Sequence, residues 1–210
     1  MDLSRQMFAD IPSVIRHHWK NGTFNWPMMA YIGLVHIAAI VGVFTVPKCS
    51  FETLLWAFIL WPISGMGITI GAHRLWSHRS FTATLPVRIL LMIFQSIANQ
   101  GSIYHWARDH RVHHKHSETN ADPHNASRGF FFAHMGWLLV KKDKRVAMAG
   151  RELDYEDLTE DGVVMFQKAL DPMFAMVMCF IMPAVVAMWG WDEDFLRAFA
   201  VAGGVRYFLV

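Results

Sequence analysis

The chain has 210 residues, of which 54% are hydrophobic and only 17% are charged, and its formal net charge at pH 7 is +2. A soluble domain carries about 25% charged residues, so this composition indicates a membrane protein. The small net charge gives no support for a nucleic-acid partner. The two cysteines, Cys49 and Cys179, are isolated and indicate neither a disulfide framework nor a cysteine-rich metal site.

Four apolar runs predict membrane helices. Residues 27–46 and 53–72 are nearly uninterrupted, and a helix of that length spans about 30 Å of hydrocarbon. A third run covers 173–191, and its length also suits a membrane span. The fourth, 195–210, contains Arg197 and Arg206 and is therefore predicted to be a partial span that inserts poorly.

The basic residues predict the orientation in the lipid bilayer. The polar region 73–172 holds 13 of the 19 Lys and Arg residues. Three further basic residues precede the first run: Arg5, Arg16 and Lys20. Loops rich in Lys and Arg stay cytosolic, so we expect the N-terminus and region 73–172 to face the cytosol.

One further apolar segment, 85–104, is not predicted to cross the membrane. It is interrupted by Arg88, Gln95, Asn99 and Gln100. If it crossed, the histidines before and after it would lie on opposite sides of the bilayer and could not share a site. We therefore expect a helix that lies in the membrane interface.

Nine of the twelve histidines lie between residues 73 and 134, and five of them form two tight groups: His73 and His78, then His110, His113 and His114. Positions i, i+3 and i+4 share one face of an α-helix, so the second group is predicted to project together. Positions 73 and 78 differ by about 140° around an α-helix. They are therefore expected to reach two different metal ions, or to lie where the helix frays.

Two such groups favour a metal site. Five neighbouring imidazoles repel one another if all are protonated, whereas a metal ion binds them in the neutral form. The absence of H-E-x-x-H gives a zincin-type protease no support. Redox iron suits an all-imidazole site at a membrane face, although spacing alone leaves zinc open. Three nearby carboxylates are candidates for orienting the imidazoles: Asp109, Glu118 and Asp122.

The remaining histidines are weaker candidates. A surface or hydrogen-bonded role explains each of them at least as well as metal binding does: His105, His116, His124 and His134. His36 lies inside the first apolar run, where we expect it to be buried or paired within the helix bundle.

Three stretches carry a family resemblance: GAHRLWSHRSF at 71–81, WARDHRVHHKHSETNADPHNASRGFFFAHMGWLL at 106–139 and RELDYEDL at 151–158. They closely resemble the animal-type acyl-CoA desaturases of the stearoyl-CoA delta-9 kind. The resemblance implies one fatty acid desaturase domain over residues 1–210. Its fold would be an all-α membrane fold with four transmembrane helices and a cytosolic helical cap, located in the endoplasmic reticulum membrane.

The resemblance also implies a reaction. Its substrates would be a long-chain fatty acyl-CoA and O2, its cofactor two iron ions, and its electron donors cytochrome b5 and its reductase. Two hydrogens would leave neighbouring methylenes, and a cis double bond would form. A methylene C–H bond offers no acidic proton, so acid–base catalysis cannot break it, whereas an oxidant made from O2 at iron can.

Position by position, the resemblance implies iron ligands at His73, His78, His110, His113 and His114. It implies contacts to the CoA head at Arg108 and Asp109, and a basic pair near the CoA phosphates at Lys141 and Lys142. The alternative for these basic residues is an ordinary cytosolic basic face. The resemblance also places Trp106 and Gln100 along the acyl tunnel. It places Trp61 and Gly65 near the blind end of the tunnel, where relatives usually have Tyr and Ala. Gly101 stands where relatives usually have Asn.

The sequence also departs from the family pattern. The third histidine box, H-x-x-H-H, and an earlier Asn and His on the fourth span do not occur, so about half of the metal ligands are missing. Three interpretations follow: a desaturase sequence that is a fragment or a C-terminally truncated product; a histidine-box membrane hydroxylase, against which the long second motif argues; or a truncated, non-catalytic protein that acts as a partner of full-length protein. Acyl chain-length preference, double-bond position and oligomeric state do not follow from the sequence.

Overall fold

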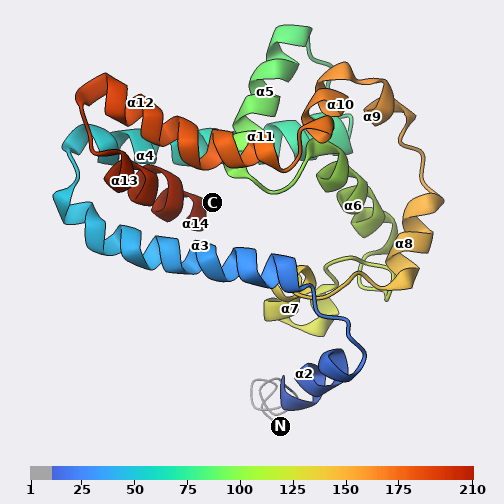
Figure 1. The fold of residues 1–210 in the computed structure, drawn as a ribbon. Coiled ribbons are helices and arrows are strands. Elements are labelled where there is room, and N and C mark those ends of the chain that lie inside the picture. Colours follow the sequence, from blue (N-terminus) through green and yellow to red (C-terminus); the bar gives the residue numbers. More distant parts are fainter. Residues whose placement is uncertain (1–10) are drawn as a thin grey trace. The chain divides into compact units, whose positions relative to one another are not determined.

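The computed structural model describes residues 11–210, and within them every regular element is a helix (Figure 1). The predicted all-α class is therefore confirmed for this part of the chain, whereas Arg5 lies outside it. Two compact units are present. Unit 1 comprises Met1–Gly33, described from residue 11, with Val112–Leu153, and unit 2 comprises Leu34–Arg111 with Asp154–Val210.

Three helices are long and apolar enough to cross a membrane, and they coincide with three of the predicted runs. The first, Trp26–Lys48, contains α3 (Trp26–Thr45) and η1 (Val46–Lys48). The second, Phe51–Ser77, contains α4 (Phe51–Met66) and η2 (Gly67–Ser77). The third, Met173–Trp191, contains α11 (Met173–Met176), η5 (Val177–Ile181) and α12 (Met182–Trp191).

The fourth apolar run is helical but short. It consists of α13 (Phe195–Ala198), η6 (Phe199–Val205) and α14 (Arg206–Phe208), and it is not among the helices long enough to span. Within unit 2, α12 lies alongside α4, and α13–α14 lie between α4 and α3 (Figure 1). The charge of Arg206 is accommodated in this packing, because its side chain is buried and donates to the carbonyls of Ala202, Ile97 and Cys179.

The surface of α3 indicates contact with lipid. Large apolar side chains along this helix are exposed, among them Leu34 at 66% and Phe44 at 76%. Its buried residues are small, Ala39 and Gly42. A soluble protein rarely exposes an apolar surface of this extent.

Glycines allow the helices of unit 2 to approach closely. A Cβ atom at Gly42 would collide with the carbonyl of Ala200 in η6, and one at Gly67 would collide with the backbone at Gln95. Small residues at helix contacts are typical of membrane bundles, where close backbone packing holds helices together. Gly67 thereby brings the second spanning helix against the helix that carries Gln95.

That helix is α5 (Leu85–Ala98), which ends at Asn99 in the left-handed conformation, φ 50°. Its 14 residues extend about 21 Å, less than the thickness of the hydrocarbon. It packs on η2, and its length supports the prediction that 85–104 does not cross the bilayer. The next helix, α6 (Ile103–His116), begins in unit 2 and continues into unit 1.

The remaining part of unit 2 packs against η2, α5 and α6. Two short helices, α9 (Glu156–Glu160) and α10 (Gly162–Ala169), contribute Leu158 and Val164 to a core with Trp76, Leu91 and Ile103.

Unit 1 is small and polar. Besides the end of α6 it contains α2 (Ile11–Lys20), η3 (Ala126–Arg128), α7 (Phe130–His134), η4 (Gly136–Leu138) and α8 (Lys144–Arg151). Val112 of α6 packs on Val146 and Ala149 of α8. A short backbone pairing of Phe24 with Val140 ties the segment before α3 to this unit.

Candidate metal centre

His73 and His78 lie side by side, in contrast to the separation expected for an α-helix. Their Nε2 atoms are 3.0 Å apart, and the ring centroids are 4.5 Å apart. The reason is that η2 is a π-helix, in which residue i bonds residue i+5. The backbone N–H of His78 accordingly donates to the carbonyl of His73. Of the two alternatives expected, separate metal ions or a helix end that departs from α-helical geometry, the short distance and the π-helix favour the second.

His110 of α6 joins this pair. Its Nε2 lies 3.1 Å from Nε2 of His78, and the potential ligand atoms of all three rings lie within 4.8 Å of one another. Two imidazole nitrogens bound at about 2.1 Å and at right angles to one metal ion lie about 3.0 Å apart. The distances among the three rings therefore fit a metal ion. His114 follows one helical turn after His110, on the same side of α6.

His113 faces a different partner. Its Nδ1 lies 2.9 Å from Oδ1 of Asp122, and its ring lies 4.1 Å from the ring of His124. The three histidines of the second group therefore do not all converge on one point, as the helical spacing alone suggested. Asp122 contacts Nδ1 of His113, an arrangement that in metal sites orients the other ring nitrogen toward the metal ion.

Asp122 is a fully buried carboxylate, and its hydrogen bonds keep it ionised. Burial raises its pKa, but the hydrogen bonds from His113 and from the backbone N–H groups of Glu118 and His124 outweigh burial and place the pKa below its ordinary value. Asp122 thus hydrogen-bonds an imidazole, and its role in orienting that imidazole stays a prediction. Glu118 contributes its backbone instead, and Asp109 accepts hydrogen bonds from Arg108.

The single histidines have varied surroundings. His105 bonds Ser102, and burial lowers its pKa. His134 stacks on Phe130, and His36 packs edge-on against Phe208. His124 alone among the weaker candidates joins a group able to hold a metal ion, with His113 and Asp122.

Of the two residues that the resemblance places along the acyl tunnel, Trp106 lies beside the histidine cluster and Gln100 lies beside Trp106. The indole of Trp106 stacks on the ring of His110 at 4.7 Å, and its Nε1 donates to Gln100 at 3.2 Å. The turn that carries Gln100 is held by a buried amide, because Gln167 accepts from the backbone N–H of Ile103 and donates to Gln95. Gly101 in the same turn has φ 79°, a conformation that favours glycine.

The predicted basic pair lies in unit 1. Lys141 and Lys142 line a hollow of about 930 Å³ whose other basic walls are His17, His18, Arg128, Lys144 and Arg145. Nζ of Lys141 donates to the carbonyl of Gly22 at 2.9 Å, and Lys142 lies 5.9 Å from the ring of Trp137. Asp122 and Asp143 also line the hollow, but its Lys and Arg residues outnumber these carboxylates, which suits an anionic ligand.

Trp61 and Gly65 lie on α4. The indole N–H of Trp61 donates to the carbonyl of Leu209 at 2.8 Å, and the side chain is 46% exposed. A Cβ atom at Gly65 would meet nothing within 4 Å, so there is open space beside it.

A histidine cluster at the end of a membrane-spanning helix defines a membrane protein with a histidine-rich site suited to a metal ion. No protein-family model matches the chain. It is 47% identical over 199 residues to "Stearoyl-CoA desaturase 2" of Rattus norvegicus, covering 95% of this chain and 54% of that protein. It is 47% identical over 185 residues to "Stearoyl-CoA desaturase" of Homo sapiens, covering 88% and 52%. With "Acyl-CoA desaturase 1" of Tachysurus fulvidraco it shares 50% identity over 186 residues, covering 88% and 55%.

The chain belongs to the stearoyl-CoA desaturase family of oxidoreductases. It spans about half the length of the curated relatives it matches.

Proposed function

We propose that this chain supplies the first half of an acyl-CoA desaturase, which introduces a cis double bond into a long-chain fatty acyl-CoA with O2 as oxidant. The observation that carries the proposal is the convergence of His73, His78 and His110 from two separate elements, at distances that fit a metal ion. The names of the relatives support acyl-CoA as the substrate class.

Iron is the proposed metal, and the proposed ligands are His73, His78, His110, His113 and His114. Bound iron supplies the redox chemistry with O2 that removes hydrogens from an unactivated methylene. Asp122 would hold the proton of His113 at Nδ1, so that Nε2 would be the atom that binds the metal ion. We propose two iron ions for the complete protein, as the family resemblance implies.

The acyl-CoA would be bound through its charged head and its apolar tail. We propose that Arg108 and Asp109 contact the CoA head and that Lys141 and Lys142 neutralise its phosphates, in accordance with the basic hollow of unit 1. Trp106 and Gln100 would line the tail near the histidines, because Trp106 stacks on His110 and donates to Gln100.

Trp61 and Gly65 would limit the length of the acyl tail. Each buried methylene is worth about 0.8 kcal/mol, so a filled tunnel end excludes longer tails. Trp61→Ala should shift the products of a completed enzyme toward longer chains, and an unchanged product profile would show that Trp61 faces something else.

The electron donors are proposed to be cytochrome b5 and its reductase. The location is proposed to be the endoplasmic reticulum membrane, with the N-terminus and the histidines in the cytosol. Three apolar spans and the basic region 73–172 support this orientation. The four-helix fold with a cytosolic cap belongs to the same proposal.

The proposal is tested in desaturase-deficient yeast with this chain completed by the C-terminal half of a relative. His110→Ala, His113→Ala and His114→Ala should each abolish unsaturated products measured by gas chromatography, because each removes a metal ligand. His116→Ala is the matched control and should retain most activity. Full activity in any of the three ligand variants would contradict the assignment.

A further inference from the structure

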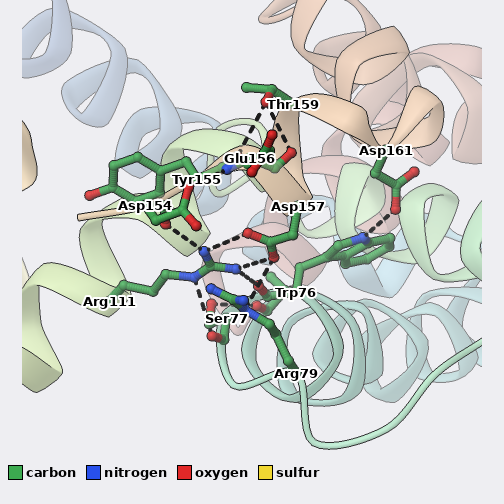
Figure 2. A network of polar contacts seen from close by, with 11 residues as sticks. Trp76, Ser77, Arg79, Arg111, Asp154, Tyr155, Glu156, Asp157, Thr159 and Asp161 are labelled. Atoms are coloured by element: carbon green, nitrogen blue, oxygen red, sulfur yellow. Dashed lines mark hydrogen bonds and ion pairs between the residues drawn. The ribbon is translucent and has the colours of Figure 1, made fainter.

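The metal centre depends on two elements that are distant in sequence, and one guanidinium joins them. His73 and His78 lie at the C-terminal end of η2, whereas His110 lies on α6. Arg111 directly follows His110, and its side chain extends to the last residues of η2 (Figure 2). The same guanidinium also reaches the segment that begins α9.

The contacts of Arg111 use all three nitrogens of its head. Nε donates to the carbonyl of Ser77 at 3.3 Å, and Nη2 donates to the carbonyl of Trp76 at 2.7 Å. Nη1 donates to the carbonyl of Asp154 at 3.0 Å. Asp157 accepts from Nη1 at 2.9 Å and from Nη2 at 2.5 Å, which makes this ion pair bidentate.

Each acceptor has a physical reason to be there. The carbonyls of Trp76 and Ser77 lie at the end of a helix, where partners within the helix are lacking and a cation is favoured. The Arg111 side chain is only 10% exposed, so its charge requires a counterion close by, which Asp157 provides. Arg79, just after His78, adds a second ion pair to Asp157 at 3.3 Å.

We propose that Arg111 and Asp157 form a clamp that sets the position of the His73–His78 pair relative to His110 and so assembles the metal centre. This inference rests on the proposed metal site and adds two positioning residues to it. Ser77 is followed immediately by His78, and Arg111 is preceded immediately by His110. A shift at the clamp therefore displaces both ligands, whose nitrogens are now 3.1 Å apart.

The clamp requires arginine. A planar guanidinium donates to several acceptors in fixed directions, whereas the ammonium of lysine is a single flexible point. Lys at position 111 keeps the charge but cannot satisfy the carbonyl groups of Trp76, Ser77 and Asp154 together with the Asp157 carboxylate. The two variants Arg111→Ala and Arg111→Lys therefore separate the geometry of the clamp from its charge.

The test measures metal binding by the 210-residue chain purified in detergent. Co²⁺ is the probe, because its visible absorption reports ligand number and geometry as well as affinity. Arg111→Ala and Arg111→Lys should each weaken Co²⁺ binding about 10- to 100-fold, the usual effect of removing a residue that orients metal ligands. Asp157→Asn should weaken it less, because the carbonyl contacts of Arg111 remain.

Glu193→Gln is the matched control for a general loss of stability. Its buried carboxylate accepts from Ser50 N and Thr53 Oγ1, both at 2.8 Å, at the start of the spanning helix that ends with η2. The helix extends about 1.5 Å per residue, so this contact is roughly 30 Å from His73. Glu193→Gln should lower the melting temperature and leave Co²⁺ affinity and absorption unchanged.

The outcomes distinguish the clamp from the metal centre. Suppose that the original chain binds Co²⁺ and that His110→Ala weakens this binding. If both Arg111 variants then bind Co²⁺ as tightly as the original, the clamp is wrong and the metal centre stands. A loss in Glu193→Gln equal to that in Arg111→Lys would also overturn the clamp. If His110→Ala leaves Co²⁺ binding unchanged, the metal centre itself is wrong. If Arg111→Ala does not fold, Arg111→Lys and Asp157→Asn decide.

Discussion

The imidazole of His113 is oriented by a carboxylate that lies only nine residues further along the chain. Asp122 is held by the backbone N–H groups of Glu118 and His124, so it cannot turn away from His113. A ligand fixed in this way loses less conformational entropy when a metal ion binds. The short connection between α6 and Asp122 therefore helps to fix the orientation of the His113 imidazole.

Asp122→Asn should weaken metal binding without unfolding the protein. The amide NH₂ that replaces one carboxylate oxygen faces a donor group, so one hydrogen bond is lost and the imidazole is released. We expect Co²⁺ affinity to fall about 10-fold or more in a titration of the purified chain. Asp143→Asn, at an exposed helix N-cap in the same unit, is the control and should bind as the original does. Equal affinity in Asp122→Asn would contradict the orienting role.

Asp161 should make stability depend on pH in the acid range. Burial raises its pKa, but hydrogen bonds from Trp76, Arg88 and Val163 outweigh burial, and the pKa lies below its ordinary value. The unfolded chain therefore binds this proton more readily than the folded chain does, and acid favours unfolding. The stabilisation is complete above the unfolded pKa of about 3.9 and is lost as the pH falls from there through the lower folded value.

The measurement is the melting temperature in detergent between pH 3 and pH 7. Asp161→Asn should melt lower than the original at pH 7, and the two curves should approach each other below about pH 4. Parallel curves over the whole range would show that Asp161 does not contribute in its ionised form.

The candidate metal ligands could be predicted from the sequence, but some of the residues that hold their helices in place could not. The five histidines stood out because they cluster in the sequence. Arg111 and Asp157 were not recognised, because their contact joins positions 46 apart and the guanidinium is held by backbone carbonyls, which carry no sequence signal. Both residues lie in stretches that carry the family resemblance, Arg111 in 106–139 and Asp157 in RELDYEDL at 151–158, but the stretches do not reveal that the two side chains meet.

At the scale of elements, the spanning helices followed the apolar runs to within a few residues, whereas the π-helix η2 did not follow from the sequence. In an α-helix, His73 and His78 would lie on different faces. The i+5 backbone hydrogen bonds of the π-helix bring the two side chains together instead. Pro62 and three glycines weaken regular α-helical bonding in the same span, and η2 begins at Gly67, where the backbone packs closely on α5. Such packing depends on the tertiary structure.

We also expect that α5 does not cross the bilayer. His78 and His110 flank α5, and their rings meet, so the chain returns to the side from which it started. In a background without native thiols, cysteines introduced at Ser80 and Lys115 should both react with an impermeant thiol reagent from the cytosolic side. In a second background that keeps Cys49, in the turn between the first two spans, as its only thiol, Cys49 should react only from the other side. Opposite labelling of positions 80 and 115 would contradict both the topology and the shared metal site.

At the scale of the whole molecule, one expectation concerned Arg197 and Arg206, whose charges were expected to hinder insertion of the last apolar run. Insertion of this run stays a prediction, but Arg206 is buried in unit 2 with its guanidinium bonded to three backbone carbonyls. The sequence could not reveal this, because the acceptors lie on α5 and η5 as well as on its own helix. Polar groups inside a membrane are tolerated where they are paired within the protein.

The last prediction is that residues 1–210 expressed alone do not desaturate acyl-CoA. The five proposed ligands come from two clusters, and five imidazoles cannot complete the coordination of two iron ions. The matched relatives are about twice as long, so the aligned region covers only part of their chains. We expect residues 1–210 in desaturase-deficient yeast to leave growth dependent on added oleate, whereas the chain completed with a relative's C-terminal half restores growth. The control is the completed chain carrying His110→Ala, which should also fail. Growth without oleate on residues 1–210, with about two iron ions bound per chain, would mean that the missing ligands come from within this sequence or from a second copy.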